Sequence, residues 1–325
     1  MPAAPSTTRV LVLRGSEIVA DPPEPLESLV GRDGQVVWID VVNPTPSAMA
    51  EIAKVCNLHP LAVEDALKRR QRPKAEAFDR YLFITTHAAR PRGTHGVALD
   101  EIDIFVGRGF VITTHAATPV IDEVRRRIQH AAPELRSVEG YLLYVILDVV
   151  VDSYFPVLDA LDQYVERLED TLFKQPTPRT MEQLFEAKRA LLQLRRVATP
   201  QRDMMNLLMR RDSLLVGAPL NVYFRDIYDH LLRITEQIDT HRDLLAGALD
   251  IYLTLTSNRL NEVVKVLTMI TAIFASLAVI TGIYGMNFER PFPPFEWRYG
   301  FVAALGLMAM SIFIMLAIFR RLGWI

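Results

Sequence analysis

A chain of 325 residues is long enough for two or three domains, and half of its residues are hydrophobic. Its formal net charge of −2 argues against nucleic-acid binding, which usually requires a basic face. The single cysteine, Cys56, excludes an intrachain disulfide framework and is typical of a reducing compartment.

The first third of the chain combines strand-like and helical segments. Runs rich in β-branched and aromatic residues, bounded by glycine, proline or aspartate, predict strands over residues 9–15, 35–42, 80–88 and 101–115. Apolar residues at helical spacing predict helices over residues 45–58 and 59–70, the first with Thr45 or Ser47 as N-cap. Together these elements predict an α/β domain over residues 1–132.

The pattern is helical over residues 133–262, where we predict a helical domain that ends in a long stalk helix. Pro156 interrupts the first helical run and predicts a kink there. Between Leu220 and Pro291 the sequence contains no proline, so one helix is predicted from about Asn221 through the apolar run that follows.

Residues 263–325 predict a transmembrane domain. Residues 263–284 and 299–319 are each apolar over the roughly 20 residues that cross a bilayer, and residues 285–298 form a short loop between them. A buried pair of core helices is the alternative, but two runs of this length are better explained by membrane spans. The 260-residue region before the first span and the absence of a signal-peptide pattern predict that both termini are cytoplasmic and the loop is outside.

One face of the first span is small or polar. Alternating steps of three and four along this span define what we call the small-residue stripe: Asn261, Val264, Thr268, Thr271, Ala275, Ala278, Gly282 and Gly285. In membranes such residues face other helices or a cavity, while bulky apolar groups face lipid. Two interpretations stay open: a tight helix–helix contact through Ala275, Ala278 and Gly282, or the lining of a pore.

An acidic stripe continues this face into the stalk at a seven-residue step: Asp229, Glu236, Asp243 and Asp250. A solvated surface is one interpretation of this stripe. Rings of carboxylates that attract cations to a pore are the other, and they require several identical stalks around an axis. Two spans cannot enclose an aqueous path, so a pore requires several subunits, with the apolar second span facing lipid.

The segment after the first span carries a specific motif. Gly285, Met286 and Asn287 follow a long stalk and precede a short loop and a final span, and in this position they closely resemble the signature of the CorA family of magnesium transporters. Residues 57–84 are also family-like, and the resemblance extends from about residue 36 to the end of the chain.

The resemblance implies a funnel-shaped homopentamer with an α/β cytoplasmic domain, a long helical stalk and two C-terminal transmembrane helices. It implies a channel for Mg²⁺, with Co²⁺ or Ni²⁺ as further cargo, in the cell's inner (plasma) membrane. Asn287 would form a ring at the outer mouth, where neutral amide oxygens accept hydrogen bonds from the water shell of Mg²⁺. Glu289 and Glu296 would attract cations to this mouth, or serve only loop solubility.

The resemblance also assigns inner positions. Asn261 and Asp250 would lie in the inner pore and Leu267 at a hydrophobic constriction. Asp226 would sense intracellular Mg²⁺ between subunits, either through a bridging metal or through contact with Arg90 or Arg92. Many relatives carry Met-Pro where this chain has Ala275 and Ser276, so the constriction is expected to be wider or nearer Leu267.

Two other functions remain as alternatives. One is Zn²⁺ transport, with proton coupling, as in another branch of the superfamily. None of the seven histidines pairs with a cysteine at zinc-ligand spacing. The other is a membrane-anchored helical sensor or scaffold, against which the small-residue stripe argues. Without a phosphate-binding loop, nucleophile elbow or metalloprotease helix, the sequence predicts neither an enzyme nor a cofactor besides Mg²⁺ as transported and regulatory ion.

Overall fold

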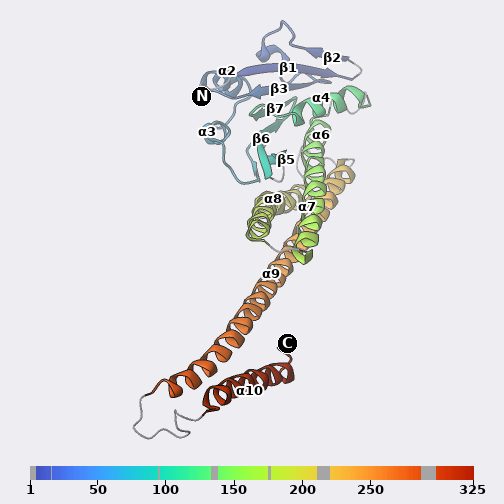
Figure 1. Ribbon diagram of the computed structural model, residues 1–325. Helices are drawn as coiled ribbons and strands as arrows, with labels where there is room; N and C mark the ends of the chain where they lie inside the picture. The colour runs from blue at the N-terminus through green and yellow to red at the C-terminus, as the bar shows by residue number, and fades with distance from the viewer. Residues whose placement is uncertain are drawn as a thin grey trace. The chain divides into compact units, whose positions relative to one another are not determined.

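A computed structural model describes seven stretches of the chain: residues 5–15, 17–93, 96–132, 138–174, 177–210, 220–286 and 298–325 (Figure 1). The chain divides into two units, Met1–Leu249 and Asp250–Ile325, which are described in turn. The predicted ring residue Asn287 lies outside the described residues, as do Glu289 and Glu296.

The first unit contains a seven-stranded mixed sheet with the strand order β2-β1-β3-β7-β6-β5-β4. Only β3 and β7 run parallel, and every other neighbouring pair is antiparallel. The strands are β1 (Thr7–Arg14), β2 (Glu17–Ala20), β3 (Val36–Val42), β4 (Lys74–Ala77), β5 (Tyr81–Arg92), β6 (Gly96–Gly107) and β7 (Phe110–His115). The four predicted strand regions are confirmed, and the region 101–115 forms a hairpin of β6 and β7.

Three short helices contribute to one hydrophobic core with this sheet: α1 (Leu26–Leu29), α2 (Pro46–Val55) and α3 (Pro60–Lys68). The Thr45 hydroxyl accepts a hydrogen bond from the Ala48 amide at 3.3 Å, which confirms Thr45 as N-cap of α2. Met49 and Ile52 of α2 are buried in the same core as Phe83 and Phe105 of the sheet. Their burial removes apolar area from water, which holds α2 on the sheet.

Four longer helices also belong to the first unit: α4 (Val120–His130), α6 (Glu139–Asp152), α7 (Tyr154–Lys174) and α8 (Pro178–Arg210). The kink predicted at Pro156 is instead a break at Ser153 between α6 and α7. Pro156 occupies the first turn of α7, where a missing amide proton disrupts no helical bond. Gln201 of α8 joins these helices to β5, because its side-chain oxygen accepts the His87 amide at 2.7 Å and its amide donates to the Tyr154 hydroxyl at 2.8 Å.

Helix α9 (Asn221–Tyr284) is 64 residues long and contributes to both units. This confirms the prediction of one helix from Asn221 through the first apolar run. In the second unit, α10 (Gly300–Arg321) corresponds to the second predicted span.

Among the described residues, three helical stretches are long and apolar enough to cross a membrane: Glu139–Leu172, Asn221–Tyr284 and Gly300–Arg321. The most apolar window of Glu139–Leu172 is 67% buried inside the protein, as expected for core helices of a folded domain. The corresponding windows of α9 and α10 are 0% and 6% buried. Exposed apolar surface on this scale is typical of helices that cross a membrane, in agreement with the two predicted spans.

Candidate functional site

The small-residue stripe is exposed along the whole apolar part of α9. All eight of its residues are exposed: Asn261, Val264, Thr268, Thr271, Ala275, Ala278, Gly282 and Gly285. Leu267, the predicted constriction, is 62% exposed beside the stripe. The stripe is therefore a free surface of the second unit.

Helix α10 packs on another face of α9. The half-buried residues in this part of α9 recur mostly at helical spacing: Lys265, Met269, Ala272, Ile273, Ser276, Leu277, Ile280 and Tyr284. Ser311 of α10 donates a hydrogen bond to Ser276 at 3.1 Å, and Lys265 donates to the Gly323 carbonyl at 3.2 Å. The tight contact through Ala275, Ala278 and Gly282, one of the two interpretations left open, is thus not made between the two spans of one chain.

Two threonines place hydrogen-bond acceptors on the small-residue stripe. The hydroxyl of Thr268 donates to the Val264 carbonyl, and that of Thr271 donates to the Leu267 carbonyl, each at 2.8 Å. Because each hydroxyl proton is used within the helix, the oxygen lone pairs remain as acceptors on the stripe. Acceptors of this kind can take hydrogen bonds from the waters around a hydrated cation.

Glycines keep the outer end of the stripe open. A Cβ atom added at Gly282 would meet nothing within 4 Å. At Gly285, just after α9 ends, the amide donates to the Thr281 carbonyl at 2.9 Å, and an added Cβ would lie 3.2 Å from that oxygen. Met286 follows and is 49% exposed. A side chain at Gly285 would crowd the helix end, so glycine suits the turn into the loop.

The four residues of the acidic stripe, including Asp250, are all exposed on α9. Oδ1 of Asp243 lies 2.9 Å from Nη2 of the neighbouring Arg242. Asp229 precedes this pair on α9 and Asp250 follows it. Exposure fits both a solvated surface and carboxylate rings, so the role of Asp250 stays a prediction.

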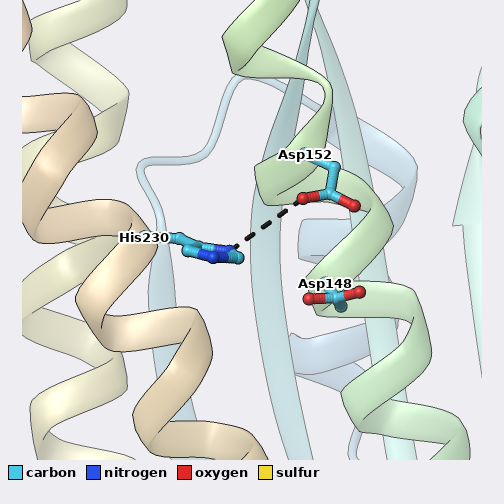
Figure 2. Close-up of side chains that lie close together, drawn as sticks. All are labelled: Asp148, Asp152 and His230. Carbon is cyan, nitrogen blue, oxygen red and sulfur yellow. Dashed lines mark ion pairs between the residues drawn. The ribbon is translucent and has the colours of Figure 1, made fainter.

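Asp226 lies one turn before His230 on α9, at the edge of a second candidate site. Nε2 of His230 is 3.9 Å from Oδ1 of Asp226, and its Nδ1 is 4.0 Å from Oδ1 of Asp152 on α6. Figure 2 shows His230 pointing from α9 toward Asp152 and Asp148. Potential ligand atoms of Asp148, Asp152 and His230 lie within 4.8 Å of one another, and two carboxylates with an imidazole could hold a divalent metal ion.

Arg127 supplies positive charge to this cluster. Its guanidinium donates to Asp148 at 2.5 Å and to Asp152 at 2.6 Å, and so ties α4 to α6. Burial raises the pKa of Asp148, the negative charge of Asp152 adds to this effect, and Arg127 opposes it. A metal ion bound here would therefore compete with Arg127 for the same carboxylates.

The prediction that Asp226 belongs to a sensing site omitted Asp148, Asp152 and His230. A signal was present, because Asp148 and Asp152 are four residues apart in an apolar helix and Asp226 and His230 repeat that spacing. The arginines named as partners of Asp226 lie elsewhere in the protomer. Arg90 pairs with Asp100 at 2.9 Å and Arg92 is exposed. Their contact with Asp226 was expected between subunits and stays a prediction.

Comparison with known proteins agrees with this architecture. The model of the family "CorA-like Mg2+ transporter protein" matches residues 33–321. The "Putative metal ion transporter YfjQ" of Bacillus subtilis is 35% identical over 301 residues, which are 92% of this chain and 93% of that protein. The "Cobalt/magnesium transport protein CorA" of Thermotoga maritima is 34% identical over 292 residues, covering 89% and 83%.

Solved structures show the same fold. The complete structure of the CorA magnesium transporter from Methanocaldococcus jannaschii superposes with a TM-score of 0.83 at 26% identity, covering 97% of this chain and 98% of that one. The ZntB cytoplasmic domain from Vibrio parahaemolyticus, at 15% identity and a TM-score of 0.62, shares the fold alone. The predicted α/β domain, long helix and two C-terminal helices are confirmed, and the chain belongs to the CorA-like Mg²⁺ transporter family of membrane proteins.

Proposed function

We propose that this protein transports divalent metal cations across the membrane, Mg²⁺ first and Co²⁺ or Ni²⁺ as further cargo, through the central pore of a homopentamer. The observation that carries the proposal is the small-residue stripe, which combines small and polar residues, is exposed, and lies apart from the contact of Ser276 with Ser311 of α10. Because two spans enclose no aqueous path, this face can line a pore only when α9 helices from several chains surround an axis. The relatives whose names mention metal ion, cobalt or magnesium transport support the choice of cargo.

The path would favour a hydrated cation. Mg²⁺ releases its waters reluctantly, so neutral acceptors that bind the water shell attract the ion without trapping it. Thr268 and Thr271 offer such acceptors in the span, and the amide of Asn287 would offer them at the outer mouth. Leu267 would form the constriction, and the rings of Asp250 and Asn261 would collect cations at the inner end. The negative-inside potential drives uptake without chemical catalysis.

Gating would follow the cytoplasmic Mg²⁺ concentration. Asp226, His230 and Asp152 present carboxylate and imidazole ligands on neighbouring helices, close to Asp148 and Arg127. A cation bound to Asp226 between subunits would offset repulsion among carboxylates and favour the closed assembly, and loss of that ion would let the subunits separate. This is feedback inhibition by the transported ion.

The spans suit a plasma (inner) membrane orientation with both termini in the cytoplasm. Arg259 and Lys265 lie at the start of the first span, and Arg320 and Arg321 lie at the end of the second. Positive charge near span ends favours the cytoplasmic side, but residues 285–298 carry Arg290 and Arg298, so the charge count alone does not decide the orientation. The 260-residue region before the first span favours the cytoplasm for both termini. In this orientation residues 285–298 form the outer loop, with Glu289 and Glu296 near the mouth.

Cation flux into liposomes that contain the purified protein tests the proposal. Mg²⁺, Co²⁺ and Zn²⁺ are compared for the wild type and Asn287→Ala, with a negative-inside potential and with or without a pH gradient. We expect Mg²⁺ flux that depends on the potential and is strongly reduced in the variant. Zn²⁺ flux that requires a pH gradient, with negligible Mg²⁺ flux, would favour a zinc transporter. No flux of any of these ions would favour a sensor or scaffold.

A further inference from the structure

The end of α10 is attached to the start of the apolar run of α9. Ser311, near the middle of α10, contacts Ser276 of α9. After α10 ends, the Gly323 carbonyl accepts a hydrogen bond from Nζ of Lys265 at 3.2 Å. These two contacts show that the helices run antiparallel, so the end of the second span and the start of the first lie together in the second unit. We call this place the junction of α9 and α10.

The chain reverses direction just after α10, and its last residues are held in place. Gly323 has a φ of 68°, a left-handed conformation that glycine adopts without strain. Its amide donates to the Arg320 carbonyl at 3.1 Å, and the Trp324 amide donates to the Phe319 carbonyl at 2.9 Å, which together form a Schellman motif. The ring of Trp324 stacks on that of Phe319, with centroids 5.8 Å apart. Tryptophan at the end of a span typically lies at the level of the lipid headgroups, which places the last turn of α10 at the membrane surface.

The charge at the junction is predominantly positive. Arg320 and Arg321 lie in the last turn of α10, and Arg259 and Lys265 flank the start of the apolar run of α9. Over residues 251–286 and 298–325, Glu262 is the one acidic residue. The three arginines are exposed, and none has an ion-pair partner among the residues that the structure describes. Four basic side chains against one carboxylate attract an anion.

Apolar side chains beside these charges distinguish a lipid from a soluble anion. Ile314 and Ile318 of α10 are each 46% exposed, and Leu322 is 60% exposed. On α9, Val266 follows Lys265 and is 49% exposed. A soluble phosphate would meet only the charged part of this surface. A phospholipid matches both parts, because its phosphate accepts hydrogen bonds from guanidinium and ammonium groups while its acyl chains cover the apolar side chains.

We propose that the junction of α9 and α10 binds the headgroup of an anionic phospholipid, with Arg320 and Arg321 as donors to its phosphate beside Lys265. A guanidinium presents paired N–H groups that match two phosphate oxygens. The ammonium of Lys265 carries three N–H donors, so it keeps donors for the headgroup besides its bond to Gly323. The lipid thereby links the ends of the two spans. Only its assignment to the inner leaflet rests on the proposed orientation.

Native mass spectrometry of the full-length protein released from lipid nanodiscs tests this inference. The nanodiscs contain equal amounts of phosphatidylglycerol and phosphatidylcholine, so the lipids that stay bound report the preference for a negative headgroup. Arg320→Gln/Arg321→Gln removes two positive charges from the junction, and Arg320→Lys/Arg321→Lys keeps them. Thermal midpoints verify that every variant is folded. A parallel sample receives an excess of glycerol 3-phosphate, which carries the phosphate without acyl chains.

The matched control is Arg290→Gln/Arg298→Gln. It removes two arginines from residues 285–298, the segment between the spans, where Glu289 and Glu296 offset their charge. The control therefore makes the same change in net charge away from the junction.

We expect the wild type to retain phosphatidylglycerol over phosphatidylcholine by at least about tenfold, and the glutamine double variant to lose most of this preference. The lysine double variant and the control should keep it. Equal preference in the glutamine double variant and the control would overturn the proposal. Displacement of phosphatidylglycerol by glycerol 3-phosphate would overturn the assignment to a lipid. Since lipid retention is measured without transport, absent flux in liposomes together with arginine-dependent lipid retention would refute only the proposed function.

Discussion

Leucine at Gly282 is expected to block transport without destabilising the protein. In the protomer an added Cβ at this position meets nothing within 4 Å, so the larger side chain fits without displacing a neighbour. Replacing glycine in a helix by a strong helix former also stabilises the helix by about 0.8–1 kcal/mol. If the stripe lines the pore, Gly282→Leu places a leucine from every subunit into the path, and we expect Mg²⁺ flux to fall at least tenfold. That corresponds to an increase of at least about 1.4 kcal/mol in the barrier.

Gly306→Leu is the matched control for this prediction. Gly306 is an exposed glycine of α10 at which an added Cβ also meets nothing within 4 Å. This variant should transport Mg²⁺ like the wild type, because we expect the second span to face lipid rather than the pore. Both variants are reconstituted in liposomes, with their oligomeric state measured by native mass spectrometry. Wild-type flux through an assembled Gly282→Leu protein would refute the assignment of this face to the pore.

Three further predictions concern other parts of the chain. Charge reversal by Asp250→Lys should lower single-channel conductance several-fold at low salt, and an unchanged conductance would reduce the acidic stripe to a solvated surface. A double-mutant cycle of Ser276→Ala and Ser311→Ala should give a coupling energy of about 0.6 kcal/mol in thermal stability. Additive effects of the two substitutions would show that this hydrogen bond does not stabilise the packing of α9 on α10. Burial raises the pKa of Asp103 to about 7 from 3.8, so the folded state favours the neutral carboxyl. The stability that this preference contributes is fully present below pH 3.8 and is lost as the pH rises through 7. Asp103→Asn should therefore stabilise the protein at pH 8 by at most about 4 kcal/mol and have little effect at pH 4, and equal shifts of the melting temperature at both would contradict this.

Much of the fold is predictable because its signals are local. The strands β3, β5, β6 and β7 carry long apolar runs, and α9 is one uninterrupted helix because no proline breaks it. β2 and β4 were not predicted, since Glu17–Ala20 and Lys74–Ala77 are short and β4 contains residues that rarely favour strands. Pairing with β1 and β5 makes them strands, and such pairing depends on distant parts of the chain.

Of the candidate sites, too, those formed within one helix are predictable from the sequence, and those formed by packing of several helices are not. The small-residue stripe is a periodic feature of one helix, so its common exposure follows from the spacing of its residues. The cluster around His230 joins α6 and α9, and Arg127 reaches it from α4, so only the packing of three helices reveals it. Ala275 and Ser276 both differ from the family pattern, but the structure places them differently. Ala275 is exposed on the small-residue stripe, while Ser276 accepts a hydrogen bond from Ser311 of α10, and the sequence motif alone does not distinguish the two positions.

Thiol accessibility along α9 tests the central claim most directly. Burial raises the pKa of Cys56, the single native cysteine, to about 12, so this thiol should not react and needs no substitution. Cysteine is introduced at Thr271 or Ala275 of the small-residue stripe, and as a control at Phe274, which is 67% exposed outside the stripe. A membrane-impermeant, positively charged thiol reagent is then applied during Mg²⁺ flux. The account predicts reaction and block at Thr271→Cys and Ala275→Cys with no effect at Phe274→Cys, and block at Phe274→Cys alone would contradict it.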